Sequence, residues 1–113
     1  MEESDFKTYH YNVVGLNSEV TGVIKLKGDT IFNGQIDGEL HLTEGKLVLE
    51  RGSKIKGKIF AHEIEVFGEI SGDIFCSGKL SFRSSAKFDG DIQSNSLVIY
   101  PGAQINMHAQ ALE

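Results

Sequence analysis

Two carboxylates flank a glycine in the tripeptide Asp89-Gly90-Asp91, and a close pair of this kind could serve acid–base catalysis or metal binding. For acid–base catalysis, the pKa of one carboxyl group must be shifted, either by burial or by a charged or hydrogen-bonding group held close to it. Related tripeptides elsewhere in the chain carry Lys, Ser or Thr at the same two positions, so a carboxylate is not required there. The sequence pattern also predicts no fixed partner that would shift the pKa of either carboxyl group. We therefore interpret Asp89 and Asp91 as solvated charges and not as a catalytic pair.

The other side chains capable of chemistry are scattered. The histidines share no position of the repeat described below: His10, His41, His62 and His108. The single cysteine, Cys76, excludes an intramolecular disulfide and a Cys-based zinc site, and its inward position indicates a small core residue. Gly45-Lys46 and Gly78-Lys79 lack the spacing and the following Ser or Thr of a phosphate loop. We therefore expect no enzyme activity, no cofactor and no metal site.

Length and composition favour a single domain with an ordinary core, since the chain has 113 residues, of which 40% are hydrophobic and 24% charged. A formal net charge of −5 argues against binding to a nucleic-acid backbone. Gly or a charge interrupts every apolar run, so no segment is expected to span a membrane. The acidic residues 1–5 do not lead into the apolar run of a secretory signal. We expect a cytoplasmic protein without a nucleic-acid partner.

The glycines, 13 in number, are spread from Gly15 to Gly102, which disfavours a helical domain because each costs about 1 kcal/mol in a helix interior. A unit of the form apolar-x-Gly-x-apolar recurs at residues 20–24, 36–40, 55–59, 70–74, 88–92 and 105–109. The last copy has Met107 in place of the glycine. The 85 residues from Gly22 to Met107 make five steps, so the mean period is 17.

A second short strand with two inward apolar positions lies between successive copies, as in Leu47/Leu49 and Ile64/Val66. A repeat of this length built from short strands is typical of one coil of a parallel β-helix, in which like residues stack about 4.8 Å apart. Parallel crossovers are overwhelmingly right-handed. We predict an all-β, right-handed parallel β-helix of about six coils over residues 13–110. Residues 1–12 would form an N-terminal tail, flexible or covering the first coil, and residues 111–113 the C-terminal end.

Both ends of this solenoid lack an obvious capping repeat, and bare parallel-sheet ends expose unpaired backbone groups and the edge of the core. Two adhesive ends on a rigid rod give end-to-end association into a homopolymer. The predicted interface residues are Val14, Leu16, Val20 and Ile24 at the N-terminal end and Leu97, Ile99, Ile105 and Met107 at the C-terminal end.

The outward columns carry charges whose sign alternates from copy to copy. The copy with Lys56 and Lys58 lies between copies that carry carboxylates, and such pairs set register more than stability, at about 0–1 kcal/mol each. Another outward column contains Phe60 and Phe75, which we expect to stack on neighbouring coils. Two interpretations stay open for them: local cross-strand stabilisation, or a lateral or partner patch.

The repeated motif, as in residues 36–40, 55–59 and 88–92, resembles that of the bactofilins, the bacterial polymer-forming cytoskeletal proteins. The resemblance covers about residues 13–110. It implies a triangular, right-handed β-helix that polymerises through its ends without a nucleotide. It also implies a scaffold role in bacterial cell shape, envelope growth, polar organisation or motility, with envelope or cytoskeletal proteins as partners.

The resemblance is incomplete at the N-terminus. Many bactofilins carry a short apolar and basic membrane-targeting segment, whereas residues 1–7 here contain one aromatic residue and one lysine among acids. An anionic leaflet repels such a tail, which argues against direct membrane binding. Any location at the inner face of the membrane would then depend on partners.

Two other functions are known to use solenoid folds, and the sequence bears on each. An acyltransferase of the left-handed hexapeptide type requires a six-residue repeat, which the period of 17 contradicts. A discrete binding module for an envelope or carbohydrate partner could use the face of Phe60 and Phe75. Such a module is compatible with polymerisation, because a filament repeats the patch once per subunit.

Overall fold

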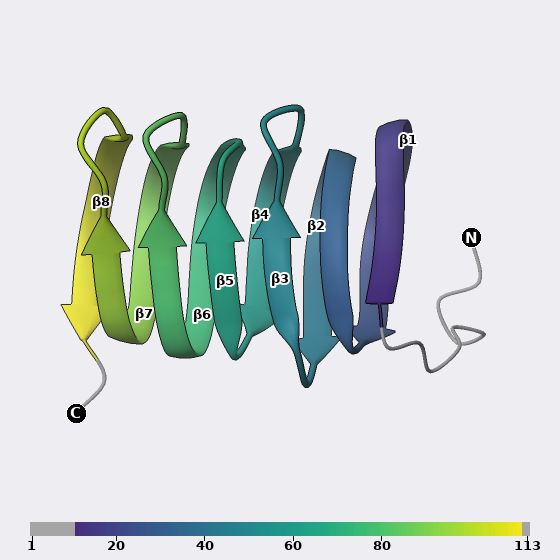
Figure 1. Ribbon diagram of the computed structural model, residues 1–113, viewed down its shortest axis with the longest axis horizontal. Coiled ribbons are helices and arrows are strands. Elements are labelled where there is room, and N and C mark those ends of the chain that lie inside the picture. Colours follow the sequence, from purple (N-terminus) through teal and green to yellow (C-terminus); the bar gives the residue numbers. More distant parts are fainter. Residues whose placement is uncertain (1–10, 112–113) are drawn as a thin grey trace.

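Parallel strands stacked along one axis make up the chain in a computed structural model that describes residues 11–111, with side chains described for residues 19–107 (Figure 1). The strands are β1 (Tyr11–Lys27), β2 (Asp29–Thr43), β3 (Lys46–Leu49), β4 (Lys54–Ala61), β5 (Glu63–Val66), β6 (Glu69–Phe82), β7 (Lys87–Ile99) and β8 (Gln104–Ala111). All of their pairings are parallel. Residues 1–10 of the predicted N-terminal tail lie outside the described residues.

The pairing register follows the repeat found in the sequence. β1, β2, β4, β6, β7 and β8 pair in that order, and the repeated glycines lie beside one another from Gly22 to Gly90. At the last step Gly90 pairs with Met107. The second short strands form their own ladder, in which β3 and β5 lie between β2 and β6. The predicted parallel β-helix with about 17 residues per coil is confirmed.

The inward columns of the repeat form one continuous core. Successive coils bury the residues on either side of the glycine, namely Ile36, Ile55, Ile70 and Phe88 before it and Leu40, Ile59, Ile74 and Ile92 after it. The second strands add Phe32, Leu47, Leu49, Ile64, Val66, Leu80 and Phe82. Equivalent residues of successive coils stack on one another. The same in–out alternation along each strand therefore buries apolar side chains in every coil.

A second inward column, at the turn before the motif, contains only small residues. Its described members are Gly34, Ser53, Gly68, Ala86 and Ala103. A Cβ atom at Gly68 would overlap the Ser53 hydroxyl, so this turn has no space for a larger side chain. The Ser53 hydroxyl donates a hydrogen bond to the Glu50 carbonyl at 2.6 Å, which satisfies a buried polar group inside the turn.

The repeated glycine is required twice over, by conformation and by space. Gly38, Gly57, Gly72 and Gly90 have φ values of 133° to 149°, which side-chain-bearing residues rarely adopt. A Cβ atom at any of them would overlap the carbonyl oxygen of the glycine one coil before it. At Gly22, in the first coil, φ is 111°, but no described atom lies within 4 Å of the added Cβ. Gly22 therefore has the conformational requirement without the steric one.

This difference provides a matched pair of variants. We expect Gly57→Ala to lower the free energy of unfolding by about 3 kcal/mol or more, because backbone strain and a collision between coils both act. Gly22→Ala should cost only about 1–2 kcal/mol from strain. Urea denaturation followed by circular dichroism measures both values. Equal losses would show that close approach between coils does not explain the glycine column.

Candidate assembly surfaces

The C-terminal end leaves apolar side chains partly uncovered. Leu97 and Ile99 lie in the last row of their face, beyond Leu80 and Phe82, to which they are paired. Leu80 and Phe82 are fully buried, whereas Ile99 is 42% exposed and Leu97 is half-buried. The pair Ile105 and Met107 on β8 is likewise half-buried against the core. All of the residues predicted for this end thus keep some accessible surface.

At the N-terminal end, β1 pairs with β2 and with no other strand of the described residues. Val14 and Leu16 lie in this strand, but their side chains are outside the described residues. Val20 is half-buried against the core, and Ile24 is buried, at 3% exposed. Of the two predicted residues that can be placed in full, Val20 offers accessible surface and Ile24 belongs to the core.

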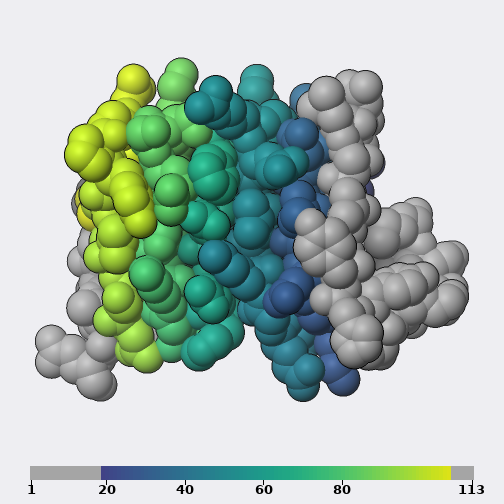
Figure 2. Space-filling model, in the orientation of Figure 1, coloured from purple at the N-terminus to yellow at the C-terminus, as the bar shows by residue number. Residues whose placement is uncertain are grey.

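Val23 is an apolar surface residue of the first coil that the sequence prediction missed. Its side chain is 43% exposed. The pairing register places it in the outward column that holds Glu39, Lys58 and Asp73 in the next coils. An apolar residue in a column of charges was visible in the sequence, and it lies on β1, as Val20 does. Figure 2 shows the described coils stacked in sequence order, from blue on the N-terminal side to yellow on the C-terminal side.

Phe60 and Phe75 stack as predicted, and His41 extends the stack by one coil. The Phe60 and Phe75 ring centroids are 4.8 Å apart with an interplanar angle of 8°, and those of His41 and Phe60 are 4.3 Å apart at 15°. His41 Nε2 also lies 2.9 Å from Glu39 Oε1. Because both faces of Phe60 are covered by its neighbours, the stack presents ring edges to solvent. It has no free Phe60 face on which a planar ligand could lie.

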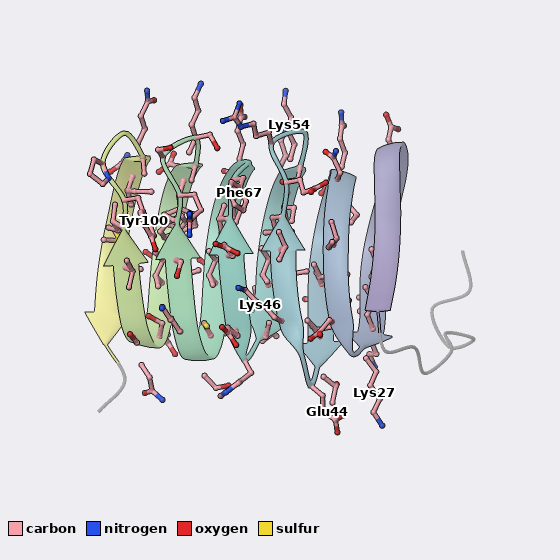
Figure 3. All side chains as sticks on the ribbon, viewed as in Figure 1. Lys27, Glu44, Lys46, Lys54, Phe67 and Tyr100 are labelled. Carbon is pink, nitrogen blue, oxygen red and sulfur yellow. The ribbon has the colours of Figure 1, made fainter. Side chains whose placement is uncertain are left out.

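Arg83 is the centre of a second cluster that joins several coils. Its guanidinium lies 2.8 Å from Glu65 Oε2, and the ammonium of Lys46 lies 3.2 Å from the other carboxylate oxygen. The Arg83 Cζ atom is 4.2 Å from the centroid of the Tyr100 ring and 5.6 Å from that of Phe67. Figure 3 labels Lys46, Phe67 and Tyr100 on this side of the molecule. The cluster ties the turn that follows β7 to the middle of the rod.

In the part of the chain that the structure describes, the side chains capable of chemistry do not converge on one site. Cys76 is buried, and burial raises the pKa of its thiol, with backbone hydrogen bonds at Gly78 and Ile64 acting in the opposite direction. Its Sγ donates a hydrogen bond to the His62 carbonyl at 3.2 Å. Asp89 and Asp91 occupy the outward columns paired with Ser71 and Asp73. Among the described residues, no group of three or more His, Cys, Asp or Glu side chains is arranged to hold a metal ion.

The ring stack should contribute measurably to stability. We expect Phe60→Ala to lower the free energy of unfolding by about 2 kcal/mol, because it removes a half-buried ring with aromatic contacts on both faces. Gln93→Ala, in the same outward column but exposed, should change it by less than about 0.5 kcal/mol. Thermal melting of both variants tests this, and a neutral Phe60→Ala would assign the rings to a role other than stability.

Lysine at position 83 should restore only part of the stability that Arg83 contributes. Arg83→Ala removes both the ion pair and the stacking on Tyr100, with an expected loss of about 1–2 kcal/mol. Arg83→Lys keeps the charge beside Glu65 but not the planar group, so we expect a loss of about 0.5–1 kcal/mol. Urea denaturation at low and high salt separates the two parts, since only the ion pair is screened. Full rescue by lysine would contradict the stacking contribution.

Comparison with known proteins agrees with the geometry. The family model for bactofilins, described as polymer-forming cytoskeletal, matches residues 12–110. Bactofilin BacO of Myxococcus xanthus (strain DK1622) is 26% identical over 91 residues, which are 80% of this chain and 71% of that protein. No solved structure matches the chain. In the described part, no helix has the length and apolar character needed to cross a bilayer. The chain belongs to the bactofilin family of polymer-forming cytoskeletal proteins.

Proposed function

We propose that subunits of this protein join through the ends of the β-helix into filaments, without a nucleotide and without catalysing a reaction. The observation that carries the proposal is the contrast along one column, in which Phe82 is fully buried and Ile99, one coil further, is 42% exposed. A second subunit placed on this end would bury Ile99 and its neighbours as an internal coil buries theirs. It would also offer hydrogen-bond partners to the edge strand.

The side chains of the two Gly-Lys segments support assembly without a nucleotide. Gly45 lies in the turn between β2 and β3, and Lys46 is the first residue of β3, where its ammonium group lies 3.2 Å from Glu65 Oε1. Gly78-Lys79 lies within the continuous strand β6. Neither segment forms the strand–loop–helix arrangement in which a phosphate loop operates.

We further propose a scaffold role in bacterial cell shape, envelope organisation or motility, carried out in the cytoplasm. A filament of identical subunits repeats each surface patch once per subunit, so even a weak partner site gains from multivalency. Proteins of the envelope or the cytoskeleton are the proposed partners. Any location at the inner face of the membrane would follow from binding to them.

The face of Phe60 and Phe75 is the proposed site for such a partner, as a second function beside assembly. The stack leaves ring edges accessible, and a shallow groove beside them is lined by Thr43, His62, Ser77 and Gln93, among other residues. Edges suit side chains of a protein partner better than the flat face of a sugar ring, so we favour a protein. If Phe60→Ala combined with Phe75→Ala leaves filaments intact and abolishes partner capture, this face is a docking site.

Charge introduced at the C-terminal end should stop assembly without unfolding the subunit. We expect Met107→Lys or Ile105→Lys to give monomers or dimers with unchanged circular dichroism, because a buried junction offers an ammonium group no partner. Gln93→Lys, exposed on an internal coil, is the matched control and should still polymerise. Negative-stain electron microscopy and sedimentation without nucleotide measure the outcome. Filaments of undiminished length from both end variants would overturn the assignment of this end.

A further inference from the structure

The outer surface around the repeated glycine carries its charge in bands across the axis of the rod. On β4, Lys54, Lys56 and Lys58 are all exposed. They pair in register with Gln35, Asp37 and Glu39 on β2 and with Glu69, Ser71 and Asp73 on β6. The formal charge therefore changes from −2 to +3 to −2 over three consecutive coils, by counting these side chains. We call these nine residues the banded face.

The lysines of the banded face form no ion pair with another described residue of the subunit. The ion pairs among the described residues join His41 to Glu39, and Lys46 and Arg83 to Glu65. None of the ammonium groups of β4 lies within 4.0 Å of a carboxylate oxygen of the described residues. Figure 3 shows Lys54 extending away from the ribbon at the edge formed by the turns. Another molecule can thus reach these charges.

The order of the bands makes the charge of this surface complementary to that of a second copy, provided that the two copies are displaced along the axis. If two copies faced each other in register, the lysine bands would meet and repel. A displacement by one coil, about 4.8 Å along the axis, sets each lysine band against an acidic band of the other copy. This holds whether the second rod runs in the same or the opposite direction, since acidic bands lie on both sides of β4.

We propose that the banded face binds a second copy of this chain side by side, displaced by one coil, and so pairs filaments laterally. The proposal rests on the end-to-end assembly proposed above. A hollow of about 750 Å³ follows the same surface from Lys54 and Lys56 past Glu69 to Lys87, and it offers space for side chains of the second copy. The subunit's net charge of −5 opposes contact at long range, but salt near 0.15 M screens that repulsion beyond about 8 Å. Direct pairs across the contact are screened less.

The test compares filaments at about 0.1 M and about 0.6 M NaCl, because only the lower salt preserves contacts between exposed charges. Wild-type filaments should appear paired at the lower salt and single at the higher one in negative-stain electron microscopy. The triple variant Lys54→Gln, Lys56→Gln and Lys58→Gln should form single filaments of normal length at both salts. Neutral substitutions on exposed positions preserve the fold, which circular dichroism checks.

The matched control removes the same charge elsewhere, through Lys25→Gln, Arg51→Gln and Lys79→Gln, all at exposed positions. It should pair like the wild type. Pairing that persists in the β4 variant, or single wild-type filaments at both salts, would overturn the proposal. If no variant forms filaments, end-to-end assembly fails instead. Lateral binding is then decided by sedimentation, since wild-type subunits should form salt-sensitive dimers that the β4 variant does not form.

Discussion

Close contact of glycine backbones from coil to coil is the constraint on which the rest of the structure depends. The carbonyl oxygen of each repeated glycine occupies the position that a Cβ atom on the next glycine would need. This contact fixes the distance between coils at the bend, and the positive φ of these glycines fixes the direction in which the chain leaves it. When the glycines of two coils are paired, the residues before and after them are paired in register as well.

In a solenoid, each inner coil pairs with a coil on both sides, so its backbone groups and apolar side chains are covered. The first and last coils of the described rod pair on one side. Phe82 and Ile99 occupy equivalent positions, yet within the described part of the chain Phe82 has a paired strand on each side and Ile99 on one side. The pairing that buries an internal side chain thus leaves a terminal one accessible, together with the backbone groups of the edge strand. Polymer formation is the property of this family, and the end-to-end assembly proposed above would cover these terminal groups.

The outer surface is less constrained and differs from coil to coil. The ring stack and the cluster around Arg83 stabilise particular coils, whereas the charged columns contribute little to stability within the subunit. Since no repeated contact dictates the outward residues, they can vary with the partner. The carboxylates at Asp89 and Asp91 illustrate this, because the columns that hold them carry lysines on β4. We interpret the outside of the rod as the part of the molecule that distinguishes one assembly from another.

The sequence alone determined the repeat, the inward columns and the register, because alternation along a strand and glycine at one fixed position leave one way to stack the copies. It also placed Phe60 and Phe75 in one column. The repeat also puts His41 in that column, but only the tertiary structure decided that its ring stacks on Phe60 and that Arg83 reaches Tyr100, since such contacts depend on side-chain conformations.

The ends show the same division between sequence and structure. The sequence identified the first and last copies of the repeat, but burial of individual side chains there follows from the path of the edge strand. Ile24 was predicted as an interface residue and lies in the core, whereas its neighbour Val23 is exposed. The pattern of a repeat specifies what all coils share. The surface that a terminal coil presents is set by the neighbour it lacks, and only the folded rod determines that.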